Sequence, residues 1–192
     1  KDLMDILGTA NDLGMVTHLN TNGHFLDDAR CRALLDTGVD SVNVSLDGSV
    51  AEVHDRIRGI PGSFDRIREG VTRLLKLRRG ALRPRVTFVT VLGMDNLDHA
   101  RGMLDLAGSL GVDRVGFIPL HEYSDGRPLE AILARRRYAA KAGEVTRALR
   151  DMRAGNDLVD NSDAYLELFE RCFQGEPSGL RCYAPYTSLV VD

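Results

Sequence analysis

The sequence has no tryptophan, little cysteine and no large excess of charge of either sign. Its three cysteines, Cys31, Cys172 and Cys182, are too few and too scattered for a disulfide framework. No apolar run approaches the ~18 residues that a membrane span requires. A net charge of −3 lacks the electrostatic footprint of a nucleic-acid binder. We therefore expect a soluble, cytoplasmic protein with neither a nucleic-acid nor a membrane partner.

Several common catalytic signatures are also missing. The chain contains no G-x-G-x-x-G, no P-loop, no H-E-x-x-H and no G-x-S-x-G. What it does contain is 43% hydrophobic and 28% charged residues in a length of 192, which is typical of a globular protein. That length allows one large domain, or one domain with a small appendage.

A repeated pattern of helix, glycine and strand organises the first 120 residues. Three helical patterns, at 3–13, 27–37 and 95–110, each end at a glycine: Gly14, Gly38 and Gly111. Glycine is favoured there because it adopts the left-handed conformation without a Cβ penalty. Short apolar runs follow at 15–19, 41–46 and 114–120, and a further helix and strand are expected at 63–79 and 85–92.

Strands that alternate with helices of this length predict βαβ units and a parallel sheet. The Val, Ile and Phe content of the strands indicates burial on both faces. Right-handed crossovers leave a doubly wound sheet or a (β/α) barrel. A complete eight-fold barrel needs about 250 residues, so a partial barrel fits better.

The pattern changes after residue 120. Residues 129–153 predict one long basic helix, whose interspersed acidic residues favour a solvated face over a phosphate or RNA surface. A helix at 164–173 and a strand at 187–191 follow. We expect one domain over residues 1–125 and a helical extension over 126–192. Because the sequence starts within a helical pattern and ends within a strand, we also expect a fragment.

Polar residues gather where the expected strands end. In parallel α/β folds these carboxyl ends form the ligand site. The residues concerned are Asn20, Thr21, Asn22, Gly23, Ser45, Asp47, Gly48, His54, Asp55, Arg58, Gly93, Asp95, Asn96, His121, Glu122, Tyr123 and Ser124. Singly, each has an ordinary explanation as a turn or cap residue. Together they favour a polar ligand with hydroxyls and a carboxylate.

The order of these residues resembles a known family. The strings T-N-G at 21–23, V-S-L-D-G at 44–48, H-D-x-x-R-G at 54–59 and G-S-F at 62–64 are similar to those of radical S-adenosylmethionine (SAM) enzymes. The similarity is greatest to the branch with peptide and sulfatase maturases, cofactor-biosynthesis enzymes and a cysteine-rich C-terminal extension. It covers about residues 1–125, and it implies a partial (β/α)6 barrel of which this chain holds about the third to sixth strands.

The resemblance also implies roles for individual residues. Thr21 and Asn22 would line the SAM pocket, and Ser45 and Asp47 would reach the amino-acid part or the ribose of SAM. Arg58 would bind the SAM carboxylate, for which a guanidinium fork is geometrically suited. Residues 89–92 and 117–120 would flank the adenine and the substrate. His121, Glu122 and Tyr123 would face the substrate and are the catalytic candidates.

Two motifs of that family are absent. There is no C-x3-C-x2-C for a [4Fe–4S] cluster and no Gly-Gly-Glu strand. We therefore expect that the chain does not hold the catalytic cluster and is inactive by itself. Cys182 resembles the start of the cysteine-rich extension, where it could ligate an auxiliary cluster or be structural. We expect Cys172 to be a helix cysteine with no metal and Cys31 to be a core residue.

The resemblance predicts the core of an iron–sulfur oxidoreductase that reductively cleaves SAM and modifies a peptide or small metabolite by hydrogen abstraction. Such an enzyme needs an electron donor such as flavodoxin or ferredoxin. The missing cysteines leave an alternative open. The chain could be a non-redox (β/α) barrel enzyme, or a binding module, that uses the same strand ends for a small polar ligand.

Overall fold

The protein is seen here as a computed structural model that describes residues 2–93, 95–120, 141 and 143–174. Its elements, in chain order, are α1 (Leu3–Asp12), β1 (His18–Thr21), α2 (Asp28–Asp36), β2 (Ser41–Ser45), α3 (Ala51–Arg58), α4 (Ser63–Arg78), β3 (Arg85–Leu92), the 3₁₀ turn η1 (Leu97–His99), α5 (Ala100–Leu110), β4 (Arg114–Pro119) and α7 (Asp163–Gln174). Residues 143–153 are also helical. None of the described helices is both long and apolar enough to cross a membrane.

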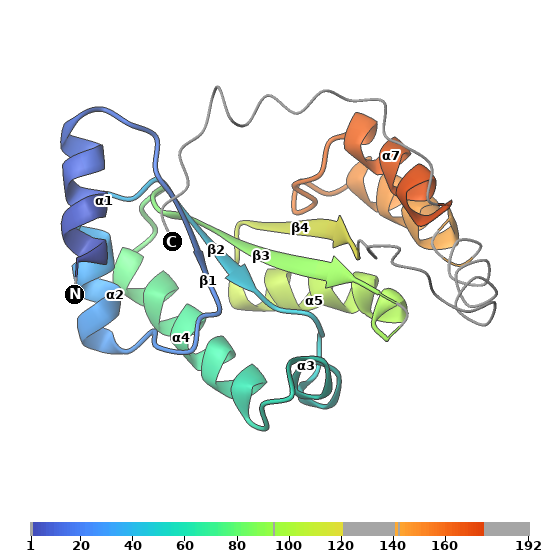
Figure 1. The fold of residues 1–192 in the computed structure, drawn as a ribbon, viewed down its shortest axis with the longest axis horizontal. Helices are drawn as coiled ribbons and strands as arrows, with labels where there is room; N and C mark the ends of the chain where they lie inside the picture. Colours follow the sequence, from blue (N-terminus) through green and yellow to red (C-terminus); the bar gives the residue numbers. More distant parts are fainter. Residues whose placement is uncertain (1, 94, 121–140, 142, 175–192) are drawn as a thin grey trace, which may run out of the picture.

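The four strands form one parallel sheet in the order β1-β2-β3-β4. Figure 1 shows α2, α4 and α5 together on one side of this sheet. Alternate residues of the strands are buried, among them Val42, Val44, Phe88 and Phe117. They join the apolar residues of the helices in one core. The predicted α/β fold with a parallel sheet is confirmed.

The predicted helix stops are confirmed as well. Gly14, Gly38 and Gly111 have φ angles of 73°, 71° and 77°. A side chain at these angles would be strained, so glycine at each position lets the chain leave the helix and turn toward the next strand.

The prediction for the first strand is wrong at its start. β1 begins at His18, and Met15 and Val16 precede it with 55% and 73% of their surface exposed. The Asp40 carboxylate accepts a hydrogen bond from the Thr17 amide at 2.8 Å, and the ladder with β2 starts one residue later, at His18 and Ser41. An apolar run was therefore a poor guide to where pairing with the neighbouring strand begins.

Burial of the strands on both faces is also wrong for β1 and β2. On the face opposite α2 and α4, the side chains of His18 and Asn20 are exposed, and those of Asn43 and Ser45 are half-buried. Asn43 donates a hydrogen bond to the Asn20 side chain at 2.9 Å. The sheet therefore has one dry face and one face with polar side chains.

The segment that follows the helix at 143–153 covers the free edge of β4. Val115 forms a parallel bridge with Val159, and the side-chain amide of Asn161 hydrogen-bonds both the N–H and the C=O of Phe117 at 2.8 Å. The predicted helix at 164–173 is present as α7. Residues 129–140 and 187–191, where the rest of the long helix and a last strand were predicted, lie outside the described residues.

Candidate functional site

The turn after β1 is held by hydrogen bonds from its own side chains to its backbone. The Thr21 hydroxyl accepts a hydrogen bond from the Gly23 amide at 3.1 Å, and the Asn22 side chain accepts one from the His24 amide at 3.0 Å. Gly23 has a φ of 71°, and a Cβ there would lie 2.9 Å from a methyl carbon of Val44. This close approach brings the T-N-G turn against β2 and so next to the V-S-L-D-G motif.

Asp47, just after β2, is the centre of a hydrogen-bonded cluster. Its side chain is only 4% exposed, and its Oδ1 accepts the Val91 amide of β3 at 2.9 Å. Its Oδ2 lies 2.7 Å from Nε of Arg58. The carboxylate therefore satisfies both oxygens within the protein, which a buried charge requires.

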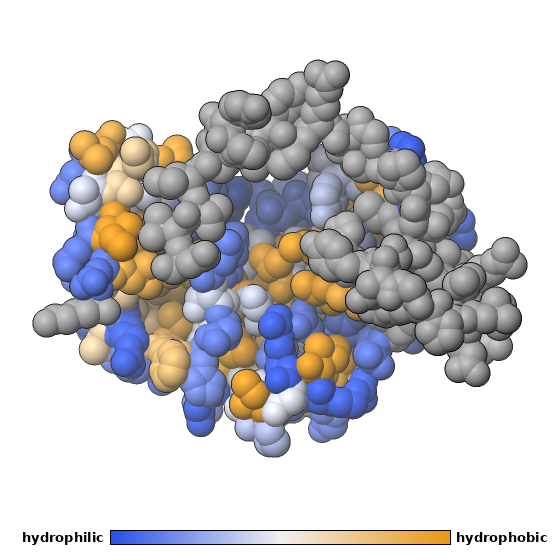
Figure 2. Space-filling view, viewed as in Figure 1, coloured by the Kyte–Doolittle hydropathy of each residue, from blue (hydrophilic) through white to orange (hydrophobic). Residues whose placement is uncertain are grey.

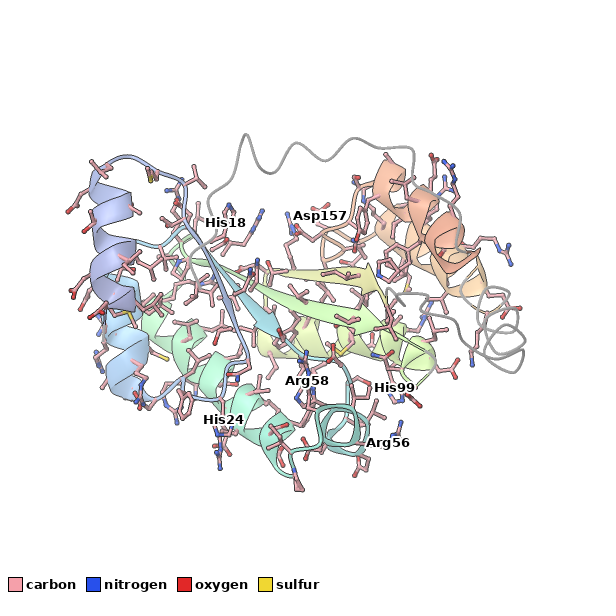
Figure 3. All side chains as sticks on the ribbon, viewed as in Figure 1. His18, His24, Arg56, Arg58, His99 and Asp157 are labelled. Atoms are coloured by element: carbon pink, nitrogen blue, oxygen red, sulfur yellow. The ribbon has the colours of Figure 1, made fainter. Side chains whose placement is uncertain are left out.

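Arg58 is the last residue of α3, a helix that the sequence did not predict. The helix has eight residues and only two of them, Val53 and His54, are buried, so it leaves little apolar periodicity to detect. Figure 3 shows Arg58 between α3 and the strands. Its side chain is 38% exposed, and its two terminal nitrogens make no hydrogen bond to any described residue. They are free to bind an anion.

The other residues of the H-D-x-x-R motif have structural partners. His54 is buried, and its Nδ1 accepts a hydrogen bond from the Asp47 amide at 3.0 Å. Asp55 accepts hydrogen bonds from the amides of Gly62 and Phe64 and from the Ser63 hydroxyl, at 2.6, 2.8 and 2.9 Å. It thereby caps the N-terminus of α4. The motif is thus an assembly that fixes α3 between the loop after β2 and α4.

The protonation state of His54 follows from this contact. Because Nδ1 accepts from the Asp47 amide, it carries no proton, and neutral His54 has its proton on Nε2. Burial lowers the pKa of His54, an effect that the nearby carboxylates of Asp47 and Asp55 oppose and Arg58 reinforces. Protonation would therefore cost burial energy and remove one hydrogen bond.

We expect acidification to destabilise the fold through His54. Its pKa is about 6.5 in the unfolded chain and lower in the fold, so the unfolded state binds more protons below about pH 6.5. The free energy of unfolding should then fall by up to about 1.4 kcal/mol per pH unit until the folded pKa is reached. Urea titrations from pH 7.5 to 5 would measure this slope. A His54→Gln variant should show a flatter slope, and equal slopes would contradict the assignment.

Ser45 ends β2 on the polar face of the sheet. Its hydroxyl makes no hydrogen bond with another described residue, and its side chain is half-buried. The register places Ser45 beside Val89 on β3, and Val91 beside Ile118 on β4. Figure 2 shows hydrophobic atoms at the centre of this view, in the region of the sheet. A free hydroxyl thus adjoins a row of half-exposed apolar side chains.

Several predicted site residues lie outside the described residues: His121, Glu122, Tyr123 and Cys182. Cys172 lies on α7, but its side chain is not among those described. Cys31 is fully buried, and burial raises the pKa of its thiol to about 11, so it is the predicted core residue. Within the described ranges, no group of three His, Cys, Asp or Glu side chains could hold a metal ion.

Asn96 was predicted to lie among the polar residues at the strand ends, but no individual role was assigned to it. Asn96 is 2% exposed and bonds the loops that follow β2 and β3, with its amide nitrogen 2.8 Å from the Asp47 carbonyl oxygen. A polar residue before a helix usually indicates a cap, and here the side chain instead reaches back across the sheet edge.

Sequence comparison identifies the family of this chain. A family described as the radical SAM superfamily matches residues 1–107, more than half of the 192 residues. The chain therefore belongs to the radical SAM superfamily, a family that uses SAM and a [4Fe–4S] cluster.

Individual relatives point to peptide-modifying and heme-forming members. A PqqA peptide cyclase of Methylocella silvestris is 30% identical over 84% of this chain and 42% of the relative. A PqqA peptide cyclase of Rhizobium meliloti is 27% identical over 97% of this chain and 52% of the relative. An AdoMet-dependent heme synthase of Methanosarcina barkeri is 33% identical over 57% of this chain and 30% of the relative. The chain spans about half the length of the peptide cyclases it matches.

Solved structures share the fold of this chain. Streptococcus suis SuiB bound to S-adenosylmethionine gives a TM-score of 0.60 at 14% identity, covering 88% of this chain and 36% of SuiB. The anSMEcpe structure with bound AdoMet and the Kp18Cys peptide gives a TM-score of 0.59 at 18% identity, covering 93% of this chain and 49% of anSMEcpe. Both likenesses concern the fold.

Proposed function

We propose that this chain is the SAM-binding core of an enzyme that modifies a peptide by hydrogen abstraction. The observation that carries the proposal is the pair Asp47–Arg58 just after β2, which leaves two guanidinium nitrogens without a partner among the described residues. Ser45, two positions before Asp47 along the chain, has a hydroxyl that likewise makes no hydrogen bond to a described residue. We further propose that the sheet is the third to sixth strands of a partial (β/α)6 barrel, within a domain over residues 1–125.

The described side chains suit the chemical groups of SAM. The free nitrogens of Arg58 match its carboxylate, for which a planar fork is favourable. The Ser45 hydroxyl suits a ribose hydroxyl or the amino-acid part. The half-exposed Val89, Val91 and Ile118 suit the apolar faces of adenine. Asp47 is engaged on both oxygens, so we assign it to holding Arg58 rather than to direct contact.

SAM, when bound, supplies the group that abstracts hydrogen from the substrate. This chain contributes binding and orientation of SAM, through Arg58 and Ser45. It does not suit the cluster, because the whole sequence has three cysteines in no C-x3-C-x2-C arrangement. We derive no step through the cluster, and we propose that these 192 residues do not cleave SAM by themselves. We propose flavodoxin or ferredoxin as the source of the electron.

A peptide substrate is favoured over a small metabolite by the extent of the matches. The peptide cyclases align with 84% and 97% of the chain, whereas the heme synthase aligns with 57%. The solved structures include SuiB bound to its precursor peptide SuiA and anSMEcpe with a peptide. The alternative is a small-molecule substrate such as a tetrapyrrole.

The test uses the polypeptide that the complete gene encodes, purified and reconstituted without oxygen. We expect about four irons per polypeptide for each cluster, SAM binding by calorimetry, and 5′-deoxyadenosine release on reduction. Absence of both SAM binding and 5′-deoxyadenosine would reject the proposal and favour a non-redox barrel that binds another polar ligand. Release of 5′-deoxyadenosine stimulated by a peptide encoded beside the gene would support the peptide assignment.

A further inference from the structure

Hydrogen bonds join the segment after β2 to the end of β3 and to the residues that follow it. Besides the contact between the Val91 amide and the Asp47 carboxylate, the Thr90 hydroxyl donates to the Leu46 carbonyl at 2.7 Å. The Ser49 hydroxyl and Nδ1 of His99 lie 3.0 Å apart. These contacts lie beyond the strand ladder, at the edge of the sheet where Arg58 is held.

Asn96 is a buried polar link between the segment after β2 and the loop after β3. Its Nδ2 donates to the Asp47 carbonyl oxygen and to the Val91 carbonyl oxygen, both at 2.8 Å, and its Oδ1 accepts from the Gly93 amide at 2.7 Å. Three of its hydrogen-bonding positions are thus used, in a site that is 2% exposed. Few other side chains could place two donors and an acceptor in this geometry.

We infer that Asn96 is a positioning residue for SAM that acts through Asp47 and Arg58. Asn96 fixes the Asp47 carbonyl oxygen, the Val91 amide fixes the Asp47 carboxylate, and that carboxylate holds Nε of Arg58 at 2.7 Å. The two terminal guanidinium nitrogens of Arg58 are thereby held in one orientation. Without Asn96, Asp47 keeps its partners but loses the anchor on its backbone, and the fork loses its fixed orientation.

This inference rests on the proposed function and makes a separate prediction. In the reconstituted full-length protein, Asn96→Ala should weaken SAM binding about tenfold, because it removes three hydrogen bonds, one of them to the backbone of Asp47, which holds Arg58. Arg58→Ala should weaken it more. If Asn96 acts through Arg58, the double variant should bind SAM within about twofold of Arg58→Ala alone. A general structural defect would instead add to the effect of Arg58→Ala.

A matched control separates positioning from stability. Thr37, near the opposite end of β2, is also buried, and its hydroxyl donates to the Leu34 carbonyl and accepts from the Val39 amide at 2.7 and 3.3 Å. Thr37→Val should lower the melting temperature and leave SAM affinity unchanged. If Asn96→Ala does not fold, Asn96→Ser, which keeps a short acceptor for the Gly93 amide, provides the same comparison.

Calorimetric titration with SAM and thermal melting of each variant decide the question. Non-additive loss of affinity for Asn96 and Arg58, with no loss for Thr37→Val, supports the inference. Unchanged affinity in the Asn96 variant, or fully additive losses, overturns it while leaving the proposed function intact. Failure of the unmodified protein to bind SAM overturns the proposed function itself, and the two failures are therefore distinguishable.

Discussion

Replacing Arg58 by alanine is expected to raise the dissociation constant for SAM by about 10- to 100-fold. Hydrogen bonds to charged groups contribute about 1.5–3 kcal/mol each, and the fork would lose its contact with the SAM carboxylate. Folding should be weakened as well, since Asp47, whose side chain is only 4% exposed, would lose the cation beside its Oδ2, and thermal melting measures that effect separately. Titration of SAM into the reconstituted protein measures the affinity.

Arg56 provides a control on the same helix. It is exposed, and its one described hydrogen bond, at 3.3 Å, is to the Asp95 carbonyl oxygen. Arg56→Ala should change SAM affinity by less than about twofold, as is usual for a solvated charge. Arg58→Lys should recover only part of the affinity because an ammonium cannot form the planar fork. Equal affinities for Arg56→Ala and Arg58→Ala would remove Arg58 from the site.

Gly48→Ala is expected to destabilise the fold by about 1–3 kcal/mol, the range for forcing extra volume into a packed region. A Cβ on Gly48 would lie 2.7 Å from the backbone nitrogen of His54 and 2.9 Å from the side chain of Val53. Because one of these is a backbone atom, α3 itself would have to move. Thermal melting should show a decrease of several degrees, and weaker SAM binding should accompany it through displacement of Arg58.

Gly8 is the matched control for this substitution. It lies inside α1, and a Cβ there would meet no atom within 4 Å. Gly8→Ala should be neutral or stabilising, because alanine favours a helix by about 1 kcal/mol over glycine. If Gly48→Ala melts at the same temperature as the unmodified protein, then α3 is not packed against the loop after β2 as described.

Local sequence patterns were sufficient for most of the architecture. The strand at Arg85–Leu92 and the helix at Ser63–Arg78 match their predicted positions to within one residue. Glycines with positive φ end the helices where expected. These features depend on short-range backbone preferences and on apolar periodicity, both of which are readable within a window of ten to twenty residues. The exceptions were α3, with little apolar periodicity, and the start of β1, which depends on Asp40 across the sheet.

The family and its order of motifs could also be recognised from the sequence, and the strand ends were correctly expected to gather polar residues. The hydrogen-bond partners of those polar residues could not be predicted from the sequence. Asp47 was expected to reach SAM, a prediction that stays open, and only the structure shows that its two oxygens contact the Val91 amide and Arg58. Asn96 lies 49 residues from Asp47 along the chain and yet bonds to its carbonyl oxygen.

By itself, then, the sequence determined the α/β class, the parallel order of helices and strands, and the family to which the chain belongs. Only the tertiary structure decided which polar side chains have hydrogen-bond partners among the described residues and which do not. The physical reason is that a buried carboxylate or amide takes its partners from whichever strand folding brings beside it, and that neighbour is remote in sequence. Asp47 holds Nε of Arg58, and the other two guanidinium nitrogens make no hydrogen bond to a described residue, which is why we propose Arg58 as the partner of the SAM carboxylate.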